Sequence, residues 1–221
     1  MEFENEHQKR IAEFYELHTR LVRDLVMLSW QTKNPHLNAA LSALPIIVEI
    51  FQRRPKTRFI LSAGHAYLAL VVYLLTQKKN PCLKYTHPEI DAAQGIEATT
   101  GSLGHGLPMA IGLAIARPDE HVDVLLGDNE AMEGTTWEGL HLISGLRLKN
   151  ITVHINNNGR GAVGECFSPV HSVMHDLPFV YVNLTKRGHG IKYCEAHPDW
   201  HKHDLTEADY NAIMEELDER Q

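Results

Sequence analysis

The sequence predicts a doubly wound α/β fold, in which a mostly parallel β-sheet carries helices on both faces. Short runs of β-forming residues alternate along the chain with stretches whose apolar residues recur at helical spacing. The clearest unit is an expected strand at 121–126, a helix at 132–146 and a strand at 151–155. Two strands joined in this way lie parallel, with the helix crossing one face of the sheet.

A helical segment, residues 1–57, precedes the first expected strand. Apolar residues at helical spacing over 6–31 predict one long amphipathic helix. A second helix is expected over 42–51, with Ser42 as its N-terminal cap and Pro45 in the first turn, where proline is tolerated.

The remaining elements continue the alternation. In chain order they are a strand at 58–61, a helix at 65–75, a small-residue helix at 104–116, a strand at 179–184, and a terminal helix that Thr206 caps and that runs to about Leu217.

Length and composition indicate an ordinary globular protein. The 221 residues, 43% hydrophobic and 22% charged, contain no linker-like tract, so a single domain over 1–221 is expected. A net charge of −7 argues against a nucleic-acid partner. Since no basic, apolar signal segment and no bilayer-length apolar run is found, a cytoplasmic protein without a membrane partner is expected. Three cysteines make a disulfide framework improbable.

The two strands of the central unit end in residues suited to a metal diphosphate. The first ends in Gly127-Asp128-Asn129-Glu130, and the second in Asn156-Asn157-Asn158-Gly159. The carboxylate of Asp128 and the amide oxygen of Asn158 are ligands that suit Mg²⁺, and parallel sheets bind ligands beyond the carboxyl ends of their strands. Each motif alone reads equally well as a surface turn. Their occurrence at consecutive strand ends favours a site.

These motifs resemble the transketolase family. The family has a GDG-type turn, an EG-x-x-WE helix start and an NN pair at the next strand end, to which Gly127-Asp128-Asn129, Glu133-Gly134-Thr-Thr-Trp137-Glu138 and Asn157-Asn158 correspond. Further segments resemble the family in the same order: His36 lies where an early SGHPG histidine would, and Leu61-Ser-Ala-Gly-His-Ala66, Thr99-Thr-Gly-Ser-Leu-Gly-His-Gly106, Gly188-His-Gly190 and Trp200-His201 follow.

The resemblance implies the thiamine-diphosphate-binding fold, with thiamine diphosphate and Mg²⁺ as cofactors. Asp128, Asn158 and the carbonyl of Arg160 would bind the metal. The cofactor-binding residues would be Gly101, Ser102, Leu103, Gly127, Asp128, Asn129, Glu130, Asn158 and His65. Glu133 would belong to a carboxylate network that crosses a subunit interface, and His36, His65, His87 and His201 would line the substrate channel.

Histidines suit that channel because carbon–carbon cleavage next to a carbonyl requires proton transfer near neutral pH. His7, His18 and His121 match no motif and are expected to be ordinary side chains. A different interpretation of the C-terminal segment is a zinc site formed by Cys194, His197, His201 and His203, although paired cysteines, the usual signature of such a site, are absent.

The glutamate that activates thiamine diphosphate belongs, in the family, to a pyrimidine-binding domain that this sequence lacks. The resemblance therefore implies a separate C-terminal pyrimidine-binding subunit, in an α₂β₂ assembly closed by two-fold symmetry. With that partner the chain would transfer a two-carbon ketol unit from a ketose phosphate to an aldose. The alternatives are transfer to an unusual acceptor in specialised metabolism, and a non-catalytic binding or regulatory paralogue.

Three departures from the family pattern stand out. Asn129 replaces the second glycine of the GDG turn, which asparagine tolerates because it accepts positive φ angles. The glycine-rich run 160–164 follows the second strand and is expected to loosen the Arg160 carbonyl. Between Glu165 and Phe179 the chain lacks a strand–helix unit, so the sheet should be shortened there, with one edge open or met by the partner.

Overall fold

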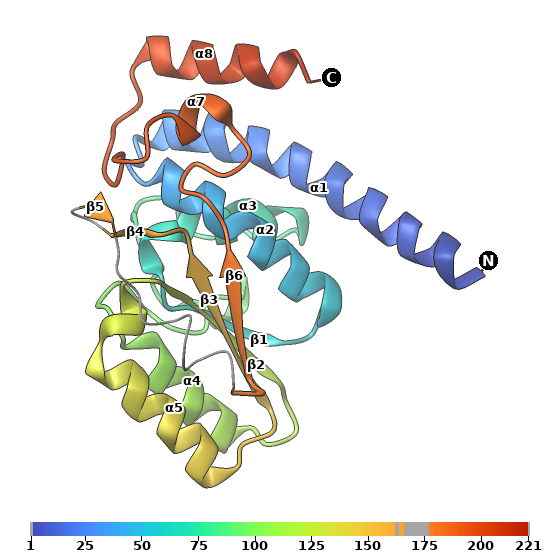
Figure 1. The fold of residues 1–221 in the computed structure, drawn as a ribbon, viewed down its shortest axis with the longest axis vertical. Coiled ribbons are helices and arrows are strands. Elements are labelled where there is room, and N and C mark those ends of the chain that lie inside the picture. The colour runs from blue at the N-terminus through green and yellow to red at the C-terminus, as the bar shows by residue number, and fades with distance from the viewer. Residues whose placement is uncertain (1, 162–163, 166–176, 221) are drawn as a thin grey trace.

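A computed structural model describes residues 2–161, 164–165 and 177–220. Its centre is a four-stranded parallel sheet in the order β1-β2-β3-β6 (Figure 1). The strands are β1 (Arg58–Leu61), β2 (Val122–Gly127), β3 (Ile151–Asn157) and β6 (Val180–Leu184). Since all four run in one direction, their carboxyl ends meet at one edge of the sheet.

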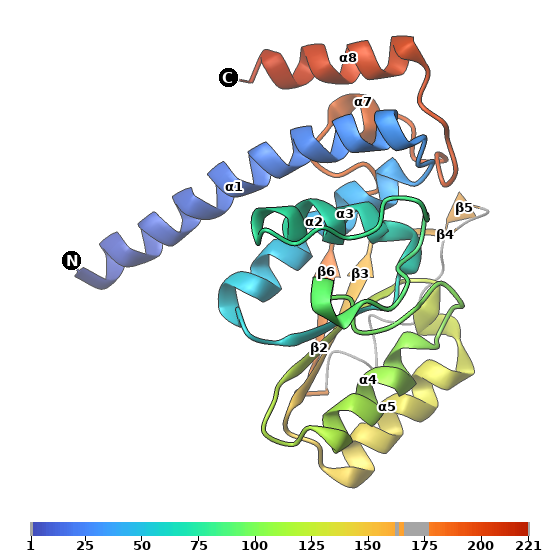
Figure 2. The ribbon, with the colours of Figure 1, turned by 180° about the vertical axis from the view of Figure 1, so that it is seen from behind.

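Helices cover both faces, as Figures 1 and 2 show from opposite sides. One face packs against α1 (Glu2–Thr32), α2 (Leu37–Arg53) and α3 (Tyr67–Thr76), and the other against α4 (Gly106–Ala116) and α5 (Gly134–Leu146). The C-terminal helices α7 (Lys192–Glu195) and α8 (Glu207–Asp218) lie beside α1. A two-stranded ribbon joins β4 (Arg160–Gly161) to β5 (Gly164–Glu165).

Alternating side chains of the strands divide the hydrophobic core in two. In β1, Phe59 and Leu61 pack with α1, α2 and α3, whereas Ile60 packs with α4 and α5. This alternation is the two-residue period of a strand, and it explains why the strands of a parallel sheet that is covered on both faces are mostly apolar. The predicted α/β class with helices on both faces is confirmed.

Most of the predicted elements lie within one or two residues of their expected positions. The strand predicted at 58–61 is β1 itself, and Thr206 caps α8 with a capping box that includes Asp209. The helices predicted from 104 and 132 begin two residues later, at Gly106 and Gly134.

The prediction for the second helix was wrong. It starts at Leu37, and Ser42 lies in its interior instead of capping it, as does Pro45. The residues from Leu37 to Leu44 are all buried, so packing against the sheet extends the helix through positions where local propensity predicted a boundary. The hydroxyl of Ser42 accepts a hydrogen bond from Asn156 at the end of β3, 2.9 Å away.

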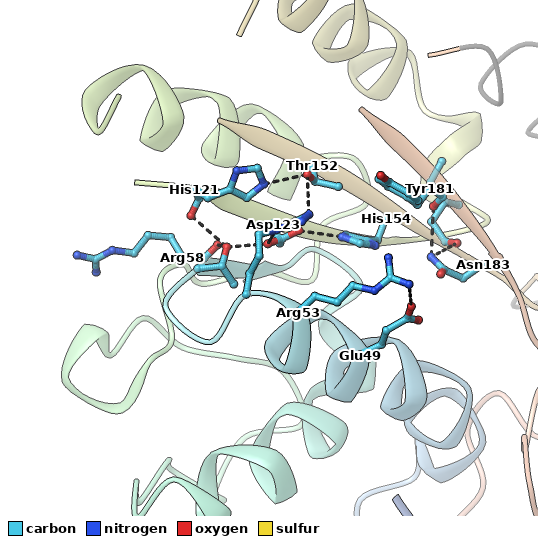
Figure 3. Close-up of polar contacts among 12 residues, drawn as sticks. Glu49, Arg53, Arg58, His121, Asp123, Thr152, His154, Tyr181 and Asn183 are labelled. Atoms are coloured by element: carbon cyan, nitrogen blue, oxygen red, sulfur yellow. Dashed lines mark hydrogen bonds and ion pairs between the residues drawn. The ribbon is translucent and has the colours of Figure 1, made fainter. Parts of the chain in front are cut away.

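A buried ion network joins α2 to the sheet on the side away from the carboxyl ends of the strands (Figure 3). Asp123 of β2 is fully buried, and its carboxylate lies 3.1 Å from Nε of Arg54, 2.9 Å from Nε2 of His154 and 2.7 Å from Oγ1 of Thr57. Burial by itself raises the pKa of Asp123, but the bonds from His154 and Thr57, together with the charge of Arg54, hold it below its usual value.

Most of the segment predicted to be shortened, between Glu165 and Phe179, lies outside the described residues. In the described part, β6 forms one edge of the sheet. None of the described helices combines the length and the apolar character needed to cross a bilayer.

Candidate functional site

A cavity of about 250 Å³ opens at the carboxyl ends of the four strands. It is lined by residues that follow β1, β2, β3 and β6, and by His36, which directly precedes α2. Most of the residues predicted to bind cofactor, metal or substrate line it: His36, His65, His87, Gly101, Leu103, Gly127, Asp128, Asn129, Glu130, Asn158, Arg160 and His201.

The predicted metal ligands meet at the ends of β2 and β3. Asp128 is 4% exposed, and its Oδ2 accepts a hydrogen bond from the backbone N–H of Arg160 at 3.3 Å. Oδ1 of Asn158 accepts from the same N–H at 3.1 Å. Burial raises the pKa of Asp128, although backbone N–H groups and Arg187 oppose the shift. A buried carboxylate and an amide oxygen thus accept from the same N–H, which brings two oxygen ligands of the kind that Mg²⁺ prefers close together.

The carbonyl of Arg160, predicted as the third metal ligand, is held in place. It accepts a hydrogen bond of 2.6 Å from Nη2 of Arg187, while the guanidinium of Arg160 lies 3.3 Å from Asp199. The glycine-rich sequence after β3 was expected to loosen this carbonyl. The contact with Arg187 fixes it instead.

Glu130, predicted to bind cofactor, lines the cavity, and its carboxylate already accepts three hydrogen bonds within the protein. It is completely buried, and it accepts hydrogen bonds from the hydroxyl of Ser62, from the backbone N–H of Gly104 at 3.1 Å and from that of Gly127 at 2.9 Å. These donors come from the ends of β1 and β2 and from the loop before α4. Glu130 thus shapes the cavity by holding three of its walls together.

His87 packs against glycine backbone. A Cβ built on Gly101, whose φ is +139°, would lie 2.8 Å from Cδ2 of His87, and one on Gly64 would lie 3.0 Å from the same atom. Only glycine at these two positions leaves room for the ring.

Four histidines of the cavity lie close together. Ring centroids of His36 and His201 lie 5.5 Å apart, those of His36 and His87 5.7 Å, and those of His65 and His201 5.6 Å. Nδ1 of His36 lies 3.0 Å from the carbonyl oxygen of His201. Because a carbonyl only accepts hydrogen bonds, Nδ1 carries the proton and Nε2 of His36 remains a proton acceptor.

The histidines are held in the neutral form. Burial, with a contribution from neighbouring histidines, lowers the pKa of His36 to about 4 and that of His65 to about 3. Burial also lowers the pKa of His87 and His201, and the positive charge of Lys202 adds to the effect. Near neutral pH these rings are therefore uncharged, and each carries one ring nitrogen that can accept a hydrogen bond.

The cavity has the features of a site for a bound group. Nδ1 of His201 is buried without a hydrogen-bond partner among the described residues, and a buried polar atom of this kind calls for one from a ligand or water. A Cβ on Gly127 would enter the space between Ala63, His65 and Glu130, at 3.9–4.0 Å from each. The missing side chain leaves the backbone of Gly127 open to close approach, as a diphosphate requires.

Two predicted residues, Ser102 and Glu133, do not line the cavity. Ser102 is exposed in the loop before α4, and Glu133 is half-buried, with its Cβ 3.0 Å from where a Cβ on Gly104 would lie. Asparagine was expected to be tolerated at position 129 because it accepts positive φ angles; its φ is −65°, so the missing glycine causes no strain.

The zinc interpretation of the C-terminal segment finds no support in the described residues. No three of their histidine, cysteine or acidic side chains are placed to share a metal ion. Cys194 is fully buried, and burial raises its pKa strongly, which disfavours the thiolate form that binds metal.

The sequence analysis missed two cationic residues of the site. Arg187, three residues after β6, is 6% exposed, and Lys202 follows His201 directly. Arg187 was open to prediction because it follows a parallel strand at the same edge as Asp128 and Asn158. Lys202 carried no such signal, since its loop reaches the cavity from outside the sheet.

Comparison with known proteins agrees with this geometry. Residues 30–169 match the family described as "Transketolase, thiamine diphosphate binding domain". The chain is 27% identical over 256 aligned positions to an apulose-4-phosphate transketolase subunit of Phocaeicola vulgatus, an alignment that covers 89% of this chain and 90% of that protein. A protein of the same name from Actinobacillus succinogenes is 30% identical, with 59% of this chain and 60% of the relative covered.

Solved structures show the same fold. Transketolase from Leishmania mexicana superposes with a TM-score of 0.76 over 93% of this chain and 41% of its own, at 22% sequence identity. A transketolase variant from Pichia stipitis gives a TM-score of 0.74, with 91% of this chain and 40% of its own covered at 20% identity. The chain thus spans about two fifths of the length of these transketolases.

Proposed function

The chain belongs to the transketolase family through its thiamine diphosphate binding domain, and we propose that it is the diphosphate-binding subunit of a split transketolase. The observation that carries this proposal is the meeting of Asp128 and Asn158 with a cluster of neutral histidines in one cavity. In the proposed enzyme, residues 1–221 form one such domain, which works in the cytosol, where sugar phosphates are metabolised.

The described residues fit Mg²⁺ and a diphosphate. Asp128, the amide oxygen of Asn158 and the carbonyl of Arg160 would hold the metal, and the positive charge of Arg187 would favour the anionic diphosphate. The open backbone of Gly127 and the loop of Gly101 and Leu103 would contact the cofactor. When bound, thiamine diphosphate supplies the nucleophilic carbon that allows a bond next to a carbonyl to be cleaved.

The histidines would handle the protons of that reaction. Nε2 of His36 has a free lone pair, and His65, His87 and His201 surround it as further neutral bases. A base there would take the proton of a substrate hydroxyl next to the carbonyl and return it to the acceptor. This supports transfer of a two-carbon ketol unit from a ketose phosphate to an aldose.

A separate pyrimidine-binding subunit, in an α₂β₂ assembly, completes the proposed enzyme. The relatives from Phocaeicola vulgatus and Actinobacillus succinogenes are each named as one subunit of a transketolase, which supports a divided enzyme. Exposed apolar side chains on and near α4 and α5 support a partner on that face, because α4 has no charged residue and a helix that is apolar all round is normally covered. These side chains are Leu103, Met109, Ile115, Met132, Leu142 and Leu146, each 42–55% exposed. Leu103 also lines the cavity, so this partner would reach the site.

Calorimetric titration of thiamine diphosphate with Mg²⁺ tests the proposal, with the chain alone and mixed with the candidate pyrimidine-binding subunit. We expect binding that appears or tightens in the mixture. Apulose 4-phosphate, named in both relatives, is the first sugar phosphate to test as a substrate of the mixture. Absence of cofactor binding in both samples would instead favour a non-catalytic paralogue.

A further inference from the structure

The loop that carries His201 into the cavity lies beyond residues 30–169, the part of the chain that matches the family. It connects α7 to α8 and contains three histidines and Trp200. Because a catalytic base must be held at a fixed position, the contacts that hold this loop matter for the site.

Three aromatic rings of the loop form a stack. The centroid of Trp200 lies 4.4 Å from that of His197 and 3.7 Å from that of His203, with interplanar angles of 21° and 16°. His201 and Lys202, which lie between Trp200 and His203 in the sequence, are the residues of this stretch that reach the cavity. The stack therefore fixes the residues on either side of this pair.

The stack is bonded to α8 through Asp209. Oδ2 of Asp209 lies 3.0 Å from Nε2 of His203 and accepts hydrogen bonds from the backbone N–H and the hydroxyl of Thr206, at 2.9 and 2.7 Å. Oδ1 accepts from the hydroxyl of Tyr193 at 2.8 Å. Asp209 is 8% exposed. One carboxylate thus joins the cap of α8 to both ends of the loop.

On its other side the loop is bonded to the residues that precede α2. The N–H of His203 donates to the carbonyl of Pro35 at 2.9 Å, and His36 donates to the carbonyl of His201 at 3.0 Å. A shift of His203 would therefore move both the ring of His201 and the hydrogen bond that sets the tautomer of His36.

We propose that Asp209 is a positioning residue: through His203 and the stack on Trp200, it holds His201 in the cavity. The proposal rests on the function proposed above in assigning His201 to the substrate channel. The structural part of the proposal, that Asp209 sets the position of the His201 ring, does not depend on that assignment.

The first test follows the ring of His201 by NMR in the chain alone, with ¹³C-labelled histidines and the signal assigned through His201→Gln. Asp209→Ala removes the bonds to His203, and His203→Phe keeps a ring for the stack but loses the bond to Asp209. Thr206→Ala is the matched control, because it weakens the cap of α8 and leaves the pair of Asp209 and His203 intact. We expect both Asp209→Ala and Thr206→Ala to lower the melting temperature.

The NMR signal of His201 should distinguish the two test variants from the control. Asp209→Ala and His203→Phe should shift or broaden the signal of His201, whereas Thr206→Ala should leave it unchanged. An unchanged His201 signal in His203→Phe, or an equal change in Thr206→Ala, would overturn the proposal. Should Asp209→Ala fail to fold, His203→Phe still decides the question.

The second test measures turnover of the chain with its partner subunit. Misplacing a catalytic base affects the chemical step, so we expect kcat to fall roughly tenfold in His203→Phe with little change in KM. Asp209→Glu, which retains a carboxylate, should lose less of kcat than Asp209→Ala. If the wild-type mixture shows no turnover, the proposed function fails, while the NMR result for Asp209 stands by itself.

Discussion

The ring of His87 lies directly against the backbone of Gly101, so that a Cβ at position 101 would come within 2.8 Å of Cδ2 of the histidine. Gly101 also has a φ of +139°, a backbone angle that residues other than glycine rarely adopt. The two residues lie in a long loop between α3 and α4, and their contact places an imidazole beside the loop that would contact the cofactor.

Gly101→Ala should therefore displace His87 and strain the loop. We expect weaker binding of thiamine diphosphate with Mg²⁺, by about tenfold or more, and a loss of stability of about 1–3 kcal/mol. Calorimetric titration and urea denaturation measure the two effects. Gly112→Ala, on the exposed side of α4 with open space around the site of the Cβ, is the matched control: it should leave binding unchanged and raise stability by up to about 1 kcal/mol, because alanine is the better helix former. Equal behaviour of the two variants would contradict the role given to Gly101.

Asp128→Ala should abolish Mg²⁺-dependent retention of the cofactor. The side chain provides the one carboxylate of the proposed metal site, and an amide oxygen and a carbonyl do not replace its charge. The fold should remain intact, because the hydrogen bonds of Asp128 go to N–H groups of the cavity wall and not to the hydrophobic core. Cofactor remaining after gel filtration in Mg²⁺, together with the circular dichroism spectrum, measures both effects. Retention equal to that of the wild type would refute the metal assignment.

Asp123→Asn should destabilise the fold without touching the site. It leaves Arg54, whose side chain is 33% exposed, without its buried anion, and it weakens the bonds from Thr57 and His154. We expect a loss of about 2–3 kcal/mol in the free energy of unfolding, below the usual cost for a fully buried pair because Arg54 keeps some water. Urea denaturation measures it. The exposed Asp119→Asn should change stability by less than about 0.5 kcal/mol.

Stability should fall as the solution is acidified. His36 and His65 have pKa values of about 4 and about 3 in the folded chain, against an ordinary value of 6.5. Above pH 6.5 both states are neutral. As the pH falls below 6.5 the unfolded chain takes up protons that the folded chain refuses, so the free energy of unfolding decreases until the folded pKa values are reached.

The contribution of one histidine can be isolated with a variant. His36→Gln should flatten the decline in the free energy of unfolding between pH 7 and pH 5, by an amount on the order of 1–2 kcal/mol. The exposed His141→Gln serves as the control and should leave the slope as in the wild type. Denaturation curves at several pH values provide the comparison, and identical slopes for all three proteins would show that His36 is not held neutral by the fold.

The sequence was informative wherever a residue follows a parallel strand. Asp128 and Asn158 were predicted to share a site because the carboxyl ends of parallel strands meet at one edge, and His65 was added through the family resemblance; the structure brings the three together. The strand and helix positions followed from periodicity, to within a residue or two. These predictions depended on local patterns and on one rule of topology.

Other features depend on contacts that no local pattern reveals. Glu130 stands in a motif that resembles a cofactor site, yet two of the three donors to its carboxylate, the hydroxyl of Ser62 and the N–H of Gly104, come from distant segments. The early start of α2 is set by burial of residues that precede Ser42. Lys202 reaches the cavity on the loop between α7 and α8, whose course the spacing of residues in the sequence does not encode.

The hydrogen bond between His36 and the carbonyl of His201 joins positions 165 residues apart. Contacts of such long range close large loops, and the entropy of loop closure makes them late events in folding. We therefore expect the cavity to be among the last parts of the chain to form. A folding intermediate would contain the sheet and its helices before it gained affinity for a diphosphate, which makes cofactor binding a sensitive reporter of the completed native state.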